Sequence, residues 1–220
     1  MGKLLNIVTP LHKRTERDYV GRMTDEKITC MKIALQYGED FWDGDRRYGY
    51  GGYQYDGRWA VVAEKLIAAY ELPETARILD VGCGKGFLLF ELKKLLPEAD
   101  IVGFDISEYA LANAKEDIRD RLFVHRAQQS YPFGDRSFDL VISLTTLHNL
   151  KIFELKTALQ EIERVGIKKY LTVEGYRNAA ELFNLECWAL TCASFYTPEE
   201  WVWLFEEYGY SGDYEFIYFE

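Results

Sequence analysis

The stretch ILDVGCGKGFLLFELKKLL, residues 78–96, constrains the fold more than any other part of the chain. A short apolar run leads into three glycines at alternate positions, Gly82, Gly84 and Gly86, and an amphipathic helical pattern follows directly. Glycine permits tight turns and a close approach of the main chain to a ligand. In open α/β sheets, ligands bind at the carboxyl ends of the strands. The stretch therefore predicts a strand, a loop that faces a ligand, and a helix.

Apolar runs and helical patterns alternate along the chain beyond residue 76. Strands are expected at 77–82, 101–105, 121–126, 138–144 and 167–174, with helices at 86–96, 107–118 and 151–165. This alternation predicts a parallel sheet with helices on both faces. Beyond 174 we expect helices at 178–195 and 197–209, the second with Thr197 as its cap and Pro198 as its first residue. The closing residues YEFIYFE read as a final strand.

The first 58 residues are expected to form an N-terminal arm, a helix and a lid, in front of a main domain at 59–220. Residues 1–23 are polar and mixed, and 24–38 are predicted to form a helix that starts at Thr24 and ends at Gly38. Residues 41–59 are dense in Tyr, Gly and Asp, which indicates an ordered loop. A further helix is expected at 59–71.

Composition argues against several functional classes. A net charge of −10 and a pI of about 4.9 argue against a nucleic-acid partner, which normally meets a clustered basic face. No apolar run reaches the roughly 18–20 residues of a membrane helix. The four cysteines lack C-x-x-C spacing and the three histidines complete no zinc pattern, so we expect free thiols and no metal. With no signal-peptide pattern at the start, a cytoplasmic location is expected.

The glycine spacing and two aspartates favour one kind of nucleotide ligand. A dinucleotide site expects G-x-G-x-x-G, whereas this loop is G-x-G-x-G with Asp80 two residues before it. That carboxylate would repel a pyrophosphate and would suit a ligand with an ammonium and a sulfonium. The next strand, IVGFD, ends in Asp105, which can accept hydrogen bonds from both hydroxyls of a ribose.

At this point the residues resemble the class I S-adenosylmethionine-dependent methyltransferases. LDVGCGKG is similar to the first motif of that family, GFDIS to its ribose motif, and YPFGDRSFDLVISLTTLHNL to its fourth-strand region; the resemblance covers about 75–175. It implies a Rossmann-like, doubly wound, mostly parallel sheet, with S-adenosyl-L-methionine as cofactor and S-adenosyl-L-homocysteine as product. The family usually ends in an antiparallel strand pair. Few residues follow Gly209, so we expect this pair to be shortened.

The resemblance also implies roles for individual residues. The methionine moiety would be held by the Asp80 carboxylate and by the glycine loop, Gly82, Cys83, Gly84 and Gly86. Asp105 would hold the ribose and Ile106 would pack on the adenine. Ala127 and Gln128 would lie by the adenine edge, where many relatives have an acidic residue. Ser143, in the fourth strand, would face the sulfur region of the cofactor.

The candidate catalytic residues are His148, Glu174 and Tyr53. His148 follows the fourth strand and titrates near neutral pH, so it is either a general base or a structural residue of its loop. Glu174 ends the fifth strand and either orients an acceptor or pairs with an arginine. Tyr53 belongs to a group that either lies over a sulfonium and an acceptor or plugs the sheet edge: Tyr48, Tyr50, Tyr53 and Tyr55, with Arg46, Arg47 and Arg58 nearby. These arginines bind either an acidic group of the acceptor or the neighbouring carboxylates.

The function that these patterns favour is methyl transfer to an oxygen or nitrogen of a small polar metabolite, such as a sugar or nucleotide-sugar. The alternatives are a methyltransferase of a protein or peptide side chain, and a cofactor-binding subunit of this fold without activity. The apolar segment 184–196 either lines the acceptor pocket or belongs to the core or a dimer face. The expected partner is a small-molecule acceptor, without nucleic acid or membrane, for a monomer or homodimer.

Overall fold

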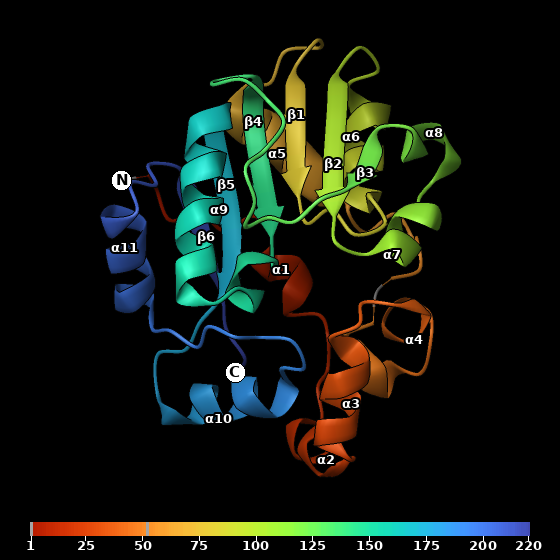
Figure 1. Cartoon of the computed structure of the whole chain (residues 1–220), viewed down its shortest axis with the longest axis vertical. Helices are drawn as coiled ribbons and strands as arrows, with labels where there is room; N and C mark the ends of the chain where they lie inside the picture. Colours follow the sequence, from red (N-terminus) through yellow and green to blue (C-terminus); the bar gives the residue numbers. More distant parts are fainter. Residues whose placement is uncertain (1, 52) are drawn as a thin grey trace.

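The computed structural model describes residues 2–51 and 53–220; Met1 of the expected arm and Gly52 of the Tyr/Gly-rich segment lie outside the described residues (Figure 1). Its centre is one six-stranded sheet with the order β3-β2-β1-β4-β5-β6. The strands are β1 (Arg77–Val81), β2 (Asp100–Asp105), β3 (Leu122–Val124), β4 (Phe138–Leu144), β5 (Gly166–Glu174) and β6 (Asp213–Ile217). All neighbours in this sheet pair in parallel. The predicted Rossmann-like fold is confirmed, and the order reverses between β1 and β4.

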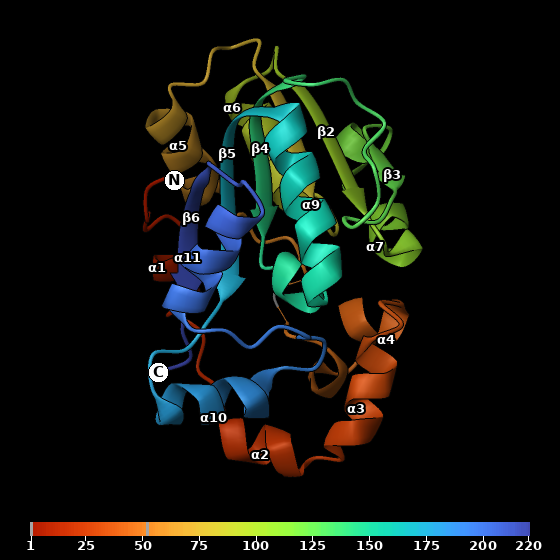
Figure 2. The same cartoon turned by 60° about the vertical axis from the view of Figure 1, so that its left-hand side comes forward.

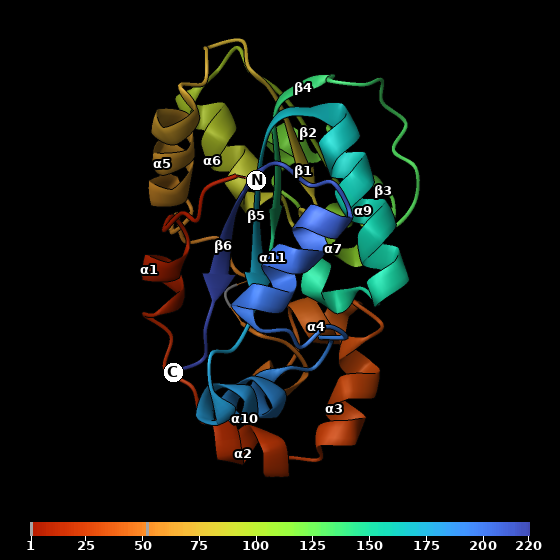
Figure 3. The same ribbon diagram turned by 90° about the vertical axis from the view of Figure 1, so that its left-hand side faces the viewer.

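Helices cover both faces of the sheet (Figure 3). Helices α5 (Ala60–Tyr70) and α6 (Phe87–Leu95) pack on one face, and α9 (Ile152–Val165) and α11 (Pro198–Glu207) pack on the other. The sequence of α9 explains its placement, because Leu155, Leu159 and Ile162 repeat at helical spacing and are almost fully buried. As predicted, α11 begins with Pro198 and is capped by the side chain of Thr197.

The C-terminal strand pair expected from the family is reduced to the single strand β6. The N-terminal arm lies along the outer edge of β6: the amide of Leu5 donates to the carbonyl of Tyr214 at 2.8 Å, and the amide of Tyr214 donates to the carbonyl of Lys3 at 3.0 Å. The arm therefore occupies backbone groups that an edge strand would otherwise expose.

A buried carboxylate fixes the arm to this strand. Glu215, 1% exposed, accepts from the amides of Ile7 at 2.6 Å and Val8 at 3.1 Å and from the amide of Thr9, at the start of helix α1 (Thr9–His12). The hydroxyl of Tyr170 in β5 also donates to Glu215. Charge-assisted hydrogen bonds of this kind are about twice as strong as neutral ones, which makes the arm part of the folded domain.

Three predicted helices are wrong in extent. Residues 107–118 form two short helices, α7 (Glu108–Ala112) and α8 (Glu116–Arg119), with extended backbone at Lys115 between them. Residues 24–38 contain only α3 (Lys27–Ala34). Thr24 ends a separate helix, α2 (Tyr19–Thr24). Glu26 adopts a left-handed backbone conformation (φ 43°), which separates α2 from α3. The predicted helix 178–195 stops early as α10 (Ala179–Trp188).

The end of α10 has a tertiary cause. The amides of Leu190 and Thr191 donate to the hydroxyl of Tyr50, and the amides of Ala193 and Ser194 donate to the carbonyl of His148. These partners satisfy backbone donors that a longer helix would have used internally. Segment 189–194 is thereby held between the N-terminal region and the loop after β4.

Residues 19–51 and 53–58, which we call the lid, lie with α10 beyond the carboxyl ends of the strands (Figures 1 and 2). The lid contains α2, α3, α4 (Glu39–Trp42) and the short 3-10 helix η1 (Arg46–Tyr48). Its hydrophobic cluster around Cys30, Ala34 and Phe41 also includes Leu190, which follows α10. The carboxylate of Asp43 ties it to the main domain, since it accepts from Lys85 Nζ at 2.6 Å and from the hydroxyl of Tyr109 at 2.9 Å.

In the part of the chain that the structure describes, no helix combines the length and the apolar character that crossing a bilayer demands.

Candidate active site

Two adjoining cavities lie between the lid and the carboxyl ends of the strands. The first has a volume of about 300 Å³ and contains Asp80, the glycine loop and Glu174 in its wall. The second has a volume of about 440 Å³ and is lined by Asp105, Ile106, Ala127 and Gln128. The residues common to both walls are Trp42, Tyr50, Tyr53, Gly82, Leu144 and Thr145. One elongated ligand can therefore extend from one cavity into the other.

The glycine loop needs its small residues at two positions. Gly82 has φ +79°, and a Cβ there would lie 2.3 Å from the side chain of Thr146. Gly84 has φ +54°, and its Cβ would lie 2.7 Å from the ring of Trp42 in the lid. Any other residue would be strained at these angles and would displace its neighbour. Gly86 lines neither cavity and instead forms the start of α6.

Asp80 supplies a buried negative charge to the first cavity. It is 4% exposed, and no described residue donates a hydrogen bond to its carboxylate. Burial, with a smaller contribution from the nearby Asp105, raises the pKa of Asp80 to about 8. A cationic ligand group at this position would compensate the cost of keeping the carboxylate ionised.

Asp105 shapes the second cavity. Its Oδ2 accepts from the amide of Gly84 at 2.8 Å and its Oδ1 accepts from the amide of Ser107 at 2.8 Å. Each carboxylate oxygen can accept more than one hydrogen bond, so both remain able to meet ligand hydroxyls. Burial raises the pKa of Asp105, while these amide donors oppose that shift.

The far wall of the second cavity includes two residues that the sequence analysis missed, His125 and Arg126. They follow β3, next to the predicted Ala127 and Gln128. The side-chain Nε2 of Gln128 donates to Oε1 of Glu154 at 3.4 Å. A carboxylate therefore does lie at the expected adenine edge, although it comes from α9.

Ser143 does not occupy the place expected for it. It is fully buried, its hydroxyl donates to the carbonyl of Val81 at 3.0 Å, and it lines neither cavity. The following residues, Leu144 and Thr145, line both cavities instead. Thr145 adopts φ +51°, which is rare for a β-branched residue, and strain of this kind tends to gather at functional sites.

His148 and Glu174 form a buried pair in the first cavity. The amide of Glu174 donates to Nδ1 of His148 at 3.4 Å, and Nε2 of His148 lies 3.4 Å from the Glu174 carboxylate. With Nδ1 as an acceptor, the neutral ring carries its proton on Nε2, facing the carboxylate. Burial lowers the pKa of His148 to about 3 and raises that of Glu174 to about 8. Glu174 is thus the stronger base of the two, and it is ionised mainly above about pH 8.

Of the four tyrosines of the Tyr/Gly-rich segment, only Tyr50 and Tyr53 line the cavities, and Tyr37, earlier in the lid, lines the second. The hydroxyl of Tyr50 is bound by the amides of Leu190 and Thr191 at 2.7 and 3.0 Å, so its role is partly structural. Burial raises the pKa of Tyr53 well above its ordinary value, which keeps its phenol neutral. Tyr55 packs against Phe87 and Phe90, outside both cavities.

The arginines expected to face the acceptor are mostly paired within the lid. Arg58 lines the first cavity, but its guanidinium binds Asp56 at 2.8 Å. Arg47 pairs with Asp25 at 2.7 Å and Glu26 at 2.9 Å.

The sequence analysis missed two arm residues of the first cavity, His12 and Arg17. Arg17 donates to Nδ1 of His12 at 3.1 Å. Because arginine cannot accept, His12 must be neutral there, and burial lowers its pKa to about 4. A polar arm far from the glycine loop carried no sequence signal for this placement.

The four cysteines are unpaired, as predicted. Among residues 2–51 and 53–220, no three His, Cys, Asp or Glu side chains gather so as to hold a metal ion.

Comparison with known proteins agrees with this geometry. The profile of the family described as Methyltransferase domain matches residues 78–167. A demethylmenaquinone methyltransferase from Roseiflexus sp. (strain RS-1) is 33% identical over 113 residues, which are 50% of this chain and 45% of that protein. A trans-aconitate 2-methyltransferase from Variovorax paradoxus (strain S110) is 35% identical over 85 residues, which are 39% of this chain and 33% of that protein. The chain thus spans less than half the length of either relative.

Among solved structures, a putative methyltransferase from Bacillus halodurans has the same fold. It superimposes with a TM-score of 0.54 at 22% identity, over 67% of this chain and 68% of that one. The parallel sheet, the glycine loop after β1, the aspartate after β2 and the profile match over residues 78–167 make this part of the chain similar to the class I S-adenosylmethionine-dependent methyltransferases, whose cofactor is S-adenosylmethionine.

Proposed function

We propose that the protein transfers a methyl group from S-adenosylmethionine to an oxygen or nitrogen of a small polar metabolite. The observation that carries this proposal is the buried carboxylate of Asp80, which has no donor among the described residues and stands beside a glycine loop at the junction of two cavities. Ionising a buried carboxylate without partners is costly, and a ligand with positive charge would offset that cost. The ammonium and sulfonium of S-adenosylmethionine meet that need.

The residues fit the parts of this cofactor in sequence. Asp80 and the main chain of Gly82, Cys83 and Gly84 would hold the methionine moiety in the first cavity. In the second cavity Asp105 would hold the ribose, and Ile106, Ala127 and Gln128 would surround the adenine. We do not retain Gly86 and Ser143 as contacts, because neither lines a cavity.

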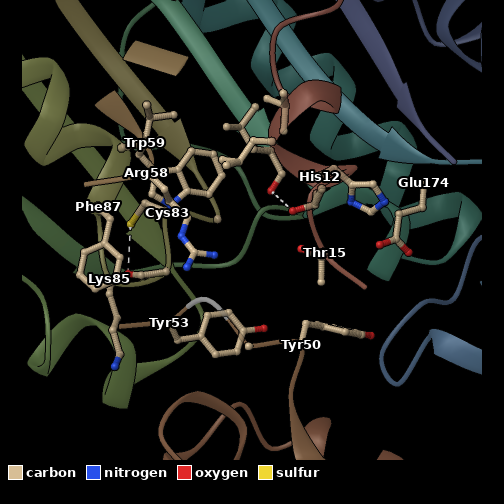
Figure 4. Close-up of a pocket in the computed structure, with 18 of the residues that line it drawn as sticks. His12, Thr15, Tyr50, Tyr53, Arg58, Trp59, Cys83, Lys85, Phe87 and Glu174 are labelled. Atoms are coloured by element: carbon tan, nitrogen blue, oxygen red, sulfur yellow. Dashed lines mark hydrogen bonds between the residues drawn. The ribbon is translucent and has the colours of Figure 1, made fainter. Parts of the chain in front are cut away.

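The acceptor would occupy the rest of the first cavity, between Glu174, Tyr53 and the arm (Figure 4). The cofactor supplies an electrophilic methyl group when bound. The methyl group would pass to the acceptor's lone pair with S-adenosylhomocysteine as the leaving product, and the Glu174 carboxylate would accept the proton that the acceptor releases. His148 holds that carboxylate in place from behind. Positioning of this kind supplies about 7–11 kcal/mol in well-oriented reactions.

The lid over the site favours a small acceptor over a protein side chain. The lid residues Trp42, Tyr50 and Tyr53 cover both cavities, and the lid is tied down through Asp43. A protein or peptide substrate would need an open groove here. The four free thiols suit a reducing compartment such as the cytoplasm.

Calorimetry with S-adenosylhomocysteine tests the cofactor site. We expect binding at micromolar strength, and we expect Asp105→Ala to weaken it by about tenfold or more, since charged hydrogen bonds contribute about 1.5–3 kcal/mol. His148→Ala serves as the matched control and should change this affinity less. Absence of heat from the wild-type protein, or the reverse order of the two variants, would reject the assignment.

A further inference from the structure

Three guanidinium groups surround one indole ring at the end of the first cavity. The guanidinium carbons of Arg17, Arg22 and Arg46 lie 5.5, 4.3 and 5.7 Å from the ring centre of Trp188. Trp188 and Arg17 line the first cavity. This concentration of positive charge is unexpected in a chain with a net charge of −10.

None of the three forms an ion pair with a described carboxylate. Arg17 donates to the carbonyls of His12 and Thr15 and to the ring of His12, and its Nε is buried without a partner. Arg22 donates to the carbonyls of Trp188, Arg46 and Gly49. Neutral acceptors satisfy hydrogen bonds but leave the charges uncompensated.

The charges also oppose one another. Burial lowers the pKa of Arg17 and of Arg22, and the positive charge of Arg46 lowers both further. Such a cluster is unfavourable in the free protein unless an anion joins it. The carboxylate of Glu174 is near enough to act on Arg17 electrostatically, but the two groups do not form an ion pair.

We propose that the Arg17 guanidinium, assisted by Arg46, binds an anionic group of the methyl acceptor, a carboxylate or a phosphate, at the Trp188 end of the first cavity. This inference rests on the proposed function, because it places the acceptor's reacting group at Glu174 and its anionic group at Arg17. Arginine suits either anion, since its planar fork matches both. Arg22 has a separate, structural role, since it binds three backbone carbonyls.

The acceptor is unidentified, so the probes are sodium phosphate and sodium benzoate. Each is titrated by calorimetry into the 220-residue chain saturated with S-adenosylhomocysteine. We expect saturable binding of at least one probe. Arg17→Gln should weaken it by about tenfold or more, the magnitude of a charge-assisted hydrogen bond. Arg46→Gln should weaken it by a smaller factor, through charge alone. Binding of phosphate only, or of benzoate only, identifies the source of the anion.

Arg14→Gln is the matched control, because Arg14 is an exposed arginine of the same arm and lines neither cavity. It should bind the probes as the wild type does. Arg46 is exposed, so Arg46→Gln keeps the proposal testable even if Arg17→Gln misfolds. The proposal fails if the wild type binds neither probe saturably, or if both variants bind like Arg14→Gln.

Affinity for S-adenosylhomocysteine separates this proposal from the proposed function. It should be equal in the wild type and all three variants. A loss confined to Arg17→Gln would assign Arg17 to the cofactor's own carboxylate and overturn the acceptor subsite. Failure of the wild type to bind S-adenosylhomocysteine would instead refute the cofactor site itself.

Discussion

Nδ1 of His148 accepts a hydrogen bond from the amide of Glu174, the residue whose side chain its other nitrogen faces. The imidazole therefore has both nitrogens engaged by one residue and is 2% exposed. This arrangement gives the two residues different tasks. Glu174 is placed to receive a proton, and His148 is placed to orient Glu174.

Glu174→Gln should lower turnover by about 10²–10⁴-fold, the usual contribution of a general base. Affinity for S-adenosylhomocysteine should change little. Because the base must be ionised and burial raises the pKa of Glu174 to about 8, kcat/KM of the wild type should rise with pH and level off above about 8. Steady-state rates between pH 6 and 9 test this, and a flat profile would remove Glu174 from the proton transfer.

His148→Ala should also lower turnover while cofactor affinity stays near normal. Its Nε2 proton faces the carboxylate and favours the ionised form, so its loss should raise the pKa of Glu174. The kcat/KM profile of the variant should accordingly move to higher pH. A lower rate without any movement of the profile would mean that His148 only supports packing.

Asp80→Asn should stabilise the free protein and impair cofactor binding. The raised pKa of Asp80 means that the folded state holds a proton more tightly than the unfolded state between about pH 4 and 8. Its contribution to the free energy of unfolding thus falls as pH rises through this window. The variant lacks this loss and should gain about 1–3 kcal/mol at pH 8 and little at pH 5.

Thermal unfolding at both pH values, without ligand, measures this difference. Asp117→Asn is the control, because Asp117 is exposed on α8 and lines neither cavity. Affinity for S-adenosylmethionine should fall by about tenfold or more in Asp80→Asn alone. Equal melting temperatures of wild type and variant at pH 8 would contradict the cost assigned to this carboxylate.

Gly84→Ala should disturb both the loop and the lid. The new methyl would lie 2.7 Å from the ring of Trp42, at φ +54°. Gly57→Ala is the matched control, since Gly57 has φ +77° but open space around its Cβ. The control should lose about 1 kcal/mol from backbone strain alone. Gly84→Ala should lose more stability than the control and should bind S-adenosylhomocysteine more weakly. If the two variants lose the same stability in thermal melts and the same affinity in calorimetry, Trp42 has no steric role.

The sheet and the glycine loop were predictable because local pattern determines them. Buried parallel strands read as apolar runs, and the alternate glycines mark a turn between the strand at 77 and the helix at 87. Asp80 and Asp105 follow from their places at strand ends. No sequence pattern predicts that the Ser143 hydroxyl donates to the carbonyl of Val81 within the sheet. The next residue, Leu144, is the first of this strand to line the cavities.

The rest of the site depends on contacts between distant segments. Arg17 and His12 lie at the first cavity on an arm that Glu215, more than 190 residues away in the sequence, binds through backbone amides. Helix α10 ends just before Leu190 and Thr191, whose backbone amides donate to the hydroxyl of Tyr50. Neither event leaves a periodic or compositional trace, so sequence reasoning predicted a plain arm and an overlong helix.

The attachment of the arm to β6 has a consequence for how such a protein changes its chemistry over time. The groups assigned to the acceptor, such as Arg17, lie on a segment held by Glu215, whereas the glycine loop follows β1 at the centre of the sheet. A new arm that keeps the three amide contacts to Glu215 could be grafted without disturbing the nucleoside end. The residues that select the acceptor could then change in evolution without changing those that bind the methyl donor.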